Sequence, residues 1–328
     1  MTAKSKNACS ACGTSPVNHS LLFILSFLEE TIGRPIDKVF TFSKKNNYKR
    51  VADIVEKILF TVSSIIGIVR FDTNLEKATT GRSKLIWEEA TRRSIPMEQI
   101  VIFGKHVELY RAIINGRRYY FQSLPIPPWL HQSGYTWLDD KFKLYKELLK
   151  ADISAPGARK IFSWKSALNA FSVLKKPVII KPRNGSRGRH TTTNIKTDEE
   201  LRHAIAVVRK ITLWSVMQEH LFGSVYRATV INNELVGFFR ADSPQVTGNG
   251  NDAIRELIEE KNENRDERLS EIIINDDLTN FLKRQNYNVE SILEKDKTIN
   301  LSAKTGRMYG GSTEEMLPNV HPKMHEIF

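Results

Sequence analysis

The sequence predicts a mixed α and β protein built from two units. The chain has 328 residues, of which 41% are hydrophobic, enough for two or more domains with proper cores. Segments with the apolar pattern of strands alternate along the chain with segments that have the apolar repeat of amphipathic helices. Three prolines at 124–129 separate two such series. We place the boundary there, so that residues 1–125 form a mixed α/β domain and residues 126–328 form a second domain.

The first unit is expected to begin with a helix, because Leu21, Leu22, Leu25 and Leu28 lie on one stripe. An Asn-Gly pair between two apolar runs predicts a hairpin turn further along. The expected elements of this unit are helices at 17–33 and 82–94, strands at 38–42, 65–71 and 99–104, and a hairpin at 107–121.

The second unit shows clearer helix starts. Two acidic residues at 139–140 suit a helix N-terminus. Thr197, followed by Glu200 three residues later, has the spacing of a capping box. The expected elements are helices at 139–156, 164–174, 197–211 and 251–263, strands at 177–181 and 213–221, and a hairpin at 225–241 around an Asn-Asn pair.

The charge of the chain does not select a partner. Lysine and arginine total 49 against 37 acidic residues, a formal net charge of +12, but the basic residues are spread along the sequence. A nucleic-acid partner is not favoured, since no stripe of alternating aromatic and basic residues is present. The longest apolar stretches, 21–28 and 58–69, fall short of the roughly 20 residues that span a bilayer. The first residues carry no apolar signal core, so the default prediction is a cytoplasmic protein without a membrane segment.

The two cysteines, Cys9 and Cys12, form one C-x-x-C pair. Such a pair is typical of half a zinc site or of a redox pair. Zinc takes about four ligands, and no second cysteine pair exists in the sequence. His19 alone does not supply the rest, so the sequence favours a frayed N-terminus.

Residues 178–190 read VIIKPRNGSRGRH, an apolar run that ends in Lys181-Pro182 and continues into a basic, glycine-containing loop. The order differs from the common phosphate loop, in which the lysine follows the glycines. Gly185 and Gly188 permit close approach of backbone N–H groups to phosphate, and arginines at 183, 187 and 189 add charge. We therefore expect a phosphate-binding loop that closes as a lid. The alternative is a solvated surface loop.

The order of these pieces resembles the ATP-grasp superfamily. The order is a lysine at a helix start, a strand ending in Lys-Pro, the basic loop, a helix, a strand ending in Gln-Glu-His-Leu, and an arginine-bearing hairpin. The stretches 246–262 and 310–322 resemble the ATP-grasp domain of cyanophycin synthetase-like carboxylate–amine ligases. The resemblance covers about residue 135 to the C-terminus.

The resemblance implies an α+β ATP-grasp fold, in which two α+β subdomains clamp ATP, preceded by the mixed α/β N-terminal domain. It implies an ATP-dependent ligase that forms amide or peptide bonds through an acyl phosphate. ATP and Mg²⁺ would be its cofactors, and a carboxylate and an amine, small molecules or peptides, its substrates. The resemblance is compatible with a homo-oligomer.

The resemblance also implies site residues. Lys141 and Lys181 would contact the phosphates of ATP, with Lys143 or Lys146 as alternatives to Lys141. Arg227 would face the site of phosphate transfer and act in catalysis. The remaining residues implied to bind the nucleotide are Gly185, Ser186, Arg187, Gly188, Gln218, Glu219 and Leu221.

Two departures from the family pattern bear on function. Val225 stands where the family places an acidic residue for the ribose. The family's magnesium ligands follow a stretch that matches 320–322, so they are expected beyond Phe328, and the domain is expected to be truncated at its C-terminus. These departures support a second hypothesis, a non-catalytic or truncated nucleotide-binding module.

Overall fold

The computed structural model describes residues 9–12, 17–33, 64, 67–122, 124–125, 138–186, 188–231 and 233–327. It divides into two compact units. One unit holds Met1–Glu30 together with Leu138–Phe328, and the other holds Thr31–Trp137. The sequence suggested one boundary after residue 125; in the structure the first 30 residues cluster with the C-terminal part of the chain.

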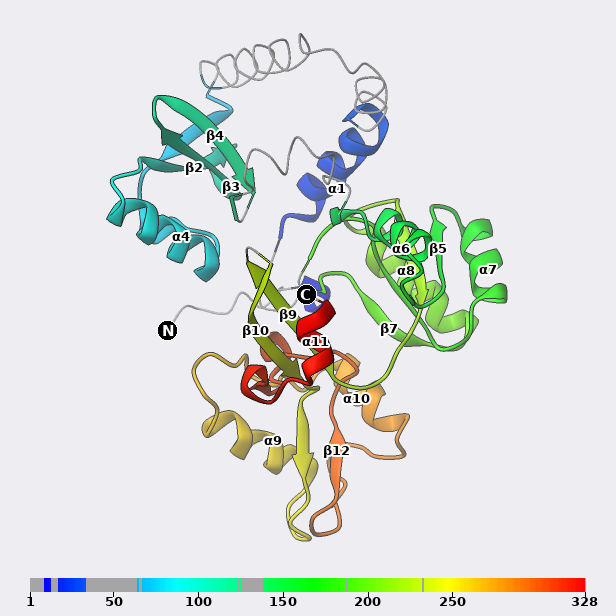
Figure 1. The fold of residues 1–328 in the computed structure, drawn as a ribbon. Helices are drawn as coiled ribbons and strands as arrows, with labels where there is room; N and C mark the ends of the chain where they lie inside the picture. The colour runs from blue at the N-terminus through cyan, green and yellow to red at the C-terminus, as the bar shows by residue number, and fades with distance from the viewer. Residues whose placement is uncertain are drawn as a thin grey trace. The chain divides into compact units, whose positions relative to one another are not determined.

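The larger unit contains a four-stranded antiparallel sheet in the order β5-β8-β6-β7. Figure 1 labels its two outer strands, β5 and β7. Its strands are β5 (Ala158–Ile161), β6 (Val178–Pro182), β7 (Thr192–Ile195) and β8 (Ser215–Glu219). The accompanying helices are α6 (Lys141–Lys150), α7 (Trp164–Val173) and α8 (Asp198–Arg209). The capping box expected at the start of α8 is confirmed, because the Thr197 side chain accepts from Glu200 N at 3.2 Å and Glu200 accepts from Thr197 N at 3.1 Å.

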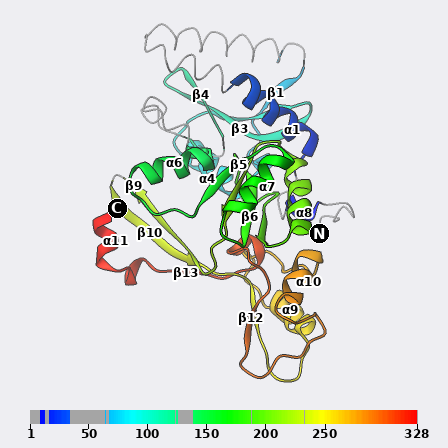
Figure 2. The ribbon, with the colours of Figure 1, turned by 90° about the vertical axis from the view of Figure 1, so that its right-hand side faces the viewer.

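Helices α7 and α8 pack on one face of this sheet (Figure 2). Val178 and Ile180 of β6 are fully buried in the core that these helices form, with Phe171 of α7 and Leu201 of α8. Successive side chains of a strand point to opposite faces. Lys181 therefore projects from the face of the sheet that α7 and α8 do not cover.

The N-terminal segment of the chain packs against the same part of the unit. It forms η1 (Ser10–Cys12), α1 (His19–Leu28) and one π-helical turn, η2 (Glu29–Gly33). Ser26 Oγ lies 2.7 Å from Thr212 Oγ1, and the ring of Phe27 lies 5.9 Å from that of Trp214. A frayed N-terminus is therefore the wrong description for residues 9–12 and 17–33.

The C-terminal half of this unit contains a second sheet and a second core. The sheet has the order β13-β10-β9, and a separate pair joins β11 to β12. The strands are β9 (Val225–Ile231), β10 (Glu234–Ala241), β11 (Gln245–Thr247), β12 (Thr298–Asn300) and β13 (Thr313–Glu315). The helices are α9 (Ile254–Glu263), α10 (Asp276–Lys283) and α11 (Pro322–Ile327), with short η5 (Arg307–Tyr309) and η6 (Leu317–Asn319). Ile254, Leu282 and Leu293 are buried at the centre of this core.

Gly248 lies where the chain leaves β11 and passes close to another backbone segment. A Cβ atom on this residue would lie 2.5 Å from Leu293 Cβ and 2.8 Å from Leu293 O. We expect Gly248→Ala to lower the free energy of unfolding by about 1–3 kcal/mol, because the neighbouring backbone must move to admit a methyl group. The measurement is urea unfolding followed by circular dichroism.

Gly81→Ala is the matched control for this prediction. Gly81 is the first residue of α4 (Gly81–Arg92), and nothing lies within 4 Å of the position of its added Cβ. Alanine there should leave stability unchanged or raise it slightly, since it reduces the freedom of the unfolded chain. Equal effects of the two substitutions would contradict the packing argument at Gly248.

The smaller unit is an antiparallel sheet in the order β1-β2-β3-β4 with helix α4 packed on it. The elements are β1 (Val69–Asp72), η3 (Leu75–Lys77), α4 (Gly81–Arg92), β2 (Met97–Ile102), β3 (Lys105–Ile114) and β4 (Arg117–Gln122). Tyr110 is fully buried and packs with Trp87 and Phe121. Asn115 and Gly116 have φ values of 49° and 72°, so the hairpin predicted from this pair is confirmed.

Most elements predicted from the sequence appear with small shifts of their ends, and a mixed α+β protein is confirmed. The helix expected at 139–156 ends early, at Lys150, because Asp152 adopts a positive φ of 57° that a helix cannot contain. The strand expected at 38–42 lies outside the described residues. Within the described residues, no helix is long and apolar enough to cross a membrane.

Candidate functional site

Asp140 fixes the start of α6 against the end of β6. Its Oδ1 accepts from the backbone N–H groups of Phe142 and Lys143 at 3.1 Å and so caps the helix. Its Oδ2 accepts from Arg183 Nε at 2.9 Å and Nη2 at 2.6 Å. Lys141 N also donates to Arg183 O at 3.1 Å. One buried carboxylate thus holds Lys141 beside the strand that carries Lys181.

Arg183 does not have the role that the sequence suggested for the loop arginines. Its side chain is 10% exposed and lies between Asp140 and Glu30, whose carboxylate accepts from Arg183 Nη1 at 3.1 Å. The sequence places Glu30 far from the loop, so this contact was not predictable from local pattern. Arg183 holds the base of the loop to α6 and to the N-terminal segment.

The two lysines expected to bind phosphate share one environment. Lys141 Nζ donates to Gly185 O at 2.6 Å, and Lys181 Nζ donates to Gln218 Oε1 at 2.7 Å. Burial, followed by the positive charge of Lys181, lowers the pKa of Lys141 to about 8, and burial also lowers the pKa of Lys181. Both shifts mean that the protein disfavours these charges in the absence of an anion. An anion between the two ammonium groups would reverse that cost.

This arrangement predicts how the affinity for ATP depends on pH. The pKa of Lys141 is lowered to about 8, so its ammonium group loses its proton as the pH rises through that value. At pH 7 most chains carry the protonated lysine, whereas at pH 9 only about one tenth of them do. If ATP binds the protonated form, its affinity should fall roughly tenfold between these two pH values. Calorimetric titration of ATP at both pH values measures the change. In Lys141→Met the decrease should largely disappear; an unchanged pH profile in that variant would contradict the assignment.

The structure also separates Lys141 from its alternatives. Lys143 and Lys146 lie on the same helix and are exposed to solvent, whereas Lys141 is half-buried and reaches the glycine-containing loop. The geometry supports Lys141 as the lysine at the site.

The glycine-containing loop uses backbone conformations that favour glycine. Gly185 and Gly188 have φ values of 106° and 62°. A Cβ on Gly188 would overlap the hydroxyl of Tyr309. Ser186 is exposed, and Arg187 lies outside the described residues. The loop thus presents its backbone beside Lys141.

The residues expected at the adenine hinge lie at the end of β8, where Gln218 and Glu219 are its last two residues, and just after it. Gln218 contacts Lys181 and donates from Nε2 to Pro156 O at 3.2 Å. The Glu219 carboxylate accepts from Gly157 N at 3.2 Å and Lys175 N at 3.1 Å, so this side chain supports neighbouring loops. Leu221 is 68% exposed. An apolar contact with a base would use such an exposed side chain.

Arg227 and Val225 lie on β9, in a different sheet from Lys181. Both are exposed. Next to Val225, Ser224 Oγ lies 2.5 Å from Asp242 Oδ1, and Arg240 Nε donates to the other oxygen of Asp242 at 3.0 Å. A carboxylate is therefore present near the start of β9, although the sequence lacks an acid at 225.

Two further features do not include the lysines. A cavity of about 460 Å³ is lined by residues of β11 and α9 and by the segment that follows α9. The side chains of Cys9, Cys12, His19 and His190 converge on one point and could hold a metal ion. Neither lysine lines this cavity. We favour the lysines as the site because they carry the electrostatic features that an anion requires.

Known proteins show sequence similarity to this chain. A cyanophycin synthetase of Synechocystis sp. is 32% identical over 155 residues, which are 45% of this chain and 18% of that protein. The chain is similar to cyanophycin synthetases. The same name is given to a protein of Geminocystis herdmanii, which is 29% identical over 193 residues, 56% of this chain and 22% of that protein. The resemblance to cyanophycin synthetases inferred from the motifs is thereby confirmed.

A second group of relatives covers more of the chain. The glutathione biosynthesis bifunctional protein GshAB of Listeria monocytogenes is 25% identical over 255 residues, 71% of this chain and 32% of that protein. A solved bifunctional glutathione synthetase from Pasteurella multocida aligns with a TM-score of 0.40 and 19% identity, over 75% of this chain and 34% of that one. No family model matches the chain. The chain spans about one fifth of the length of the two cyanophycin synthetases.

Proposed function

We propose that this chain is the ATP-binding part of an ATP-dependent carboxylate–amine ligase of the ATP-grasp type. The observation that carries the proposal is the pair of half-buried lysines, Lys141 and Lys181, beside a glycine-containing loop. The similarity to proteins named cyanophycin synthetase and to glutathione biosynthesis proteins supports the reaction class.

The proposed reaction has two steps. A carboxylate oxygen attacks the γ-phosphorus of ATP, the bond to the β,γ-bridging oxygen breaks, and ADP leaves. The amine nitrogen then attacks the carbonyl carbon of the acyl phosphate, phosphate leaves, and the amine gives up a proton. The two ammonium groups stabilise the negative charge on the phosphate oxygens in the transition state. This stabilisation is stronger in a closed site that excludes water.

The other roles belong to the same proposal. The loop backbone at Gly185, Ser186 and Gly188, with Arg187, covers the phosphates, and Gln218, Glu219 and Leu221 border the base. Arg227 contacts the group being transferred. Mg²⁺ would neutralise phosphate charge, but the described residues beside the lysines offer no evident set of oxygen ligands, so we assign none. A cytoplasmic location is part of the proposal.

The test is product analysis with ATP, Mg²⁺ and a mixture of amino acids and short peptides. We expect ADP and phosphate, formed only when both a carboxylate and an amine are present, and strongly reduced in Lys181→Met. AMP and pyrophosphate as products would contradict the mechanism. Binding of ATP without any turnover would favour the non-catalytic module, for which Val225 in place of an acid is the supporting observation.

A further inference from the structure

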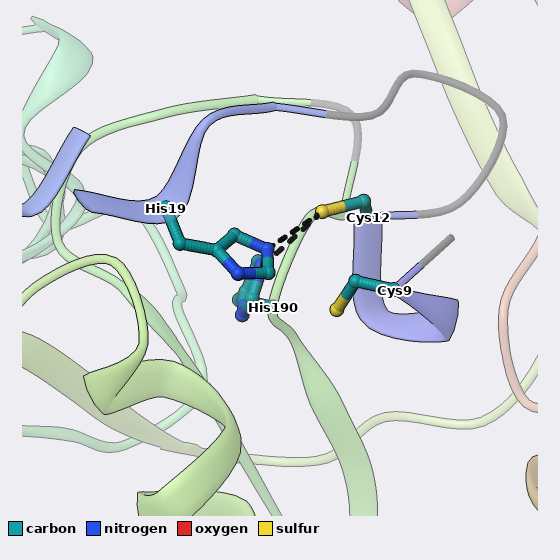
Figure 3. A group of neighbouring side chains, drawn as sticks. All are labelled: Cys9, Cys12, His19 and His190. Carbon is teal, nitrogen blue, oxygen red and sulfur yellow. Dashed lines mark hydrogen bonds between the residues drawn. The ribbon is translucent and has the colours of Figure 1, made fainter. Parts of the chain in front are cut away.

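Four side chains from distant parts of the sequence meet beside the glycine-containing loop (Figure 3). Cys9 and Cys12 belong to the N-terminal turn around η1, and His19 is the first residue of α1. His190 lies between the loop and β7. Their sulfur and nitrogen ligand atoms all lie within 4.8 Å of one another. Cys12 is 2% exposed and His190 is fully buried.

The distances between these atoms match a tetrahedral metal site. With Zn–N of about 2.0 Å and Zn–S of about 2.3 Å, tetrahedral geometry places two nitrogens about 3.3 Å apart and a nitrogen and a sulfur about 3.5 Å apart. His19 Nε2 and His190 Nε2 are 3.2 Å apart. Cys12 Sγ lies 3.1 Å from His19 Nε2 and 3.4 Å from His190 Nε2. These three atoms therefore already have the separations of ligands around one ion.

A neighbouring carbonyl prepares His190 for this role. Its Nδ1 lies 2.7 Å from Val207 O, which can only accept, so Nδ1 carries the proton. The lone pair on Nε2 then points toward Cys12 and His19. A hydrogen bond from the other ring nitrogen to a carbonyl is the usual support of a metal-binding histidine, since it fixes the tautomer and the ring orientation.

The backbone also holds His190 in place. His190 has a φ of 49°, a conformation that is uncommon for residues other than glycine. Its N–H donates to Ala11 O at 2.8 Å, within the turn that joins the two cysteines. The Cys12 N–H in turn donates to Cys9 O at 3.0 Å. The turn and the histidine are thus linked by backbone as well as by their side chains.

We propose that Cys9, Cys12, His19 and His190 bind one zinc ion that fastens the N-terminal segment to the end of the glycine-containing loop. Four protein ligands fill a tetrahedral site and leave no open position, which is the pattern of structural zinc. Two thiolates would balance the charge of the ion. The proposal does not depend on the ligase activity.

The zinc site would complete a second attachment of the same loop. At the start of the loop, Glu30 contacts Arg183, and Glu29 Oε1 accepts from Asn184 Nδ2 at 2.7 Å. At its end, His190 would share the ion with the N-terminal segment. With the ion bound, the N-terminal segment would therefore hold both ends of the loop.

The test measures metal content and spectrum in the full chain without a histidine tag. The protein is stripped with a chelator under reducing conditions, then given Zn²⁺ or Co²⁺ and freed of excess metal. We expect about one metal ion per chain. The cobalt form should show the strong visible bands of a tetrahedral site and the ultraviolet charge-transfer band of thiolate ligands. Zinc addition should raise the melting temperature and release protons from the cysteines.

Matched variants make the result specific. Cys12→Ser and His190→Asn should lose the bound ion and the thiolate band, whereas His203→Asn, an exposed histidine of α8, should keep both. If Cys12→Ser fails to fold, His19→Asn, at the less buried end of the cluster, serves in its place. A stripped wild-type chain that takes up no zinc, equal metal retention in all variants, or a Cys9–Cys12 disulfide that persists under reducing conditions would overturn the proposal.

Discussion

Replacing Arg183 with methionine is expected to lower the free energy of unfolding by about 3–5 kcal/mol. Arg183, Asp140 and Glu30 have side chains that are 10%, 4% and 6% exposed. The substitution removes the guanidinium that both buried carboxylates contact. Leaving buried charge without that compensation costs much more than losing an exposed ion pair. Chemical unfolding followed by circular dichroism measures the loss.

Arg268→Met is the control for this prediction. Arg268 pairs with Asp266 at 2.7 Å, but its side chain is 71% exposed. Removing an exposed pair should change the free energy of unfolding far less than Arg183→Met does, because solvent screens the interaction. If Arg183→Met were no more destabilising than Arg268→Met, the three buried groups would not form the attachment at the base of the loop that we describe.

Replacing Lys181 with methionine is expected to weaken ATP binding by about 1.5–3 kcal/mol, the range for a hydrogen bond that involves a charged group. This corresponds to a roughly 10- to 150-fold increase in Kd. Methionine retains much of the length and apolar surface of the lysine stem, so the sheet should remain intact. Calorimetric titration of ATP into both proteins gives the ratio.

Lys196→Met separates this effect from a general loss of positive charge. Lys196 is exposed and lies between β7 and α8. Replacing it with methionine removes one positive charge, as Lys181→Met does. Its effect on Kd should be small and should vanish with added salt. Equal weakening by the two substitutions would mean that ATP responds to net charge and not to Lys181.

Local pattern in the sequence was sufficient for most of the fold. The capping box at Thr197 and the hairpin turn at Asn115 each depend on a few neighbouring residues, and both are present. The end of α6 was predicted wrongly. The positive φ of Asp152 stops the helix, and no glycine or proline in the local sequence marks that position. Element ends are set by such single residues and are the hardest part to predict from pattern.

The site was predictable only as far as its residues are close in sequence. Lys181 and the glycines lie in one strand-to-loop stretch, which pattern could recognise. The partner of Arg183 at Glu30 lies 153 positions away, and His190 lies 171 positions from His19. Two cysteines and one nearby histidine supply only three of the four ligands that a zinc site needs. The sequence therefore favoured a frayed N-terminus. Only the fold brings the fourth ligand to them.

The central claim is that the chain takes part in phosphoryl transfer from ATP to a carboxylate, and isotope transfer tests it most directly. The protein is incubated with ATP, Mg²⁺ and a mixture of amino acids and short peptides whose carboxylates carry ¹⁸O. An acyl phosphate passes one carboxylate oxygen to the phosphate when the amine displaces it. We therefore expect ¹⁸O in inorganic phosphate and none in the nucleotide. Appearance of ¹⁸O in AMP would show that the carboxylate attacks the α-phosphorus and would contradict the account.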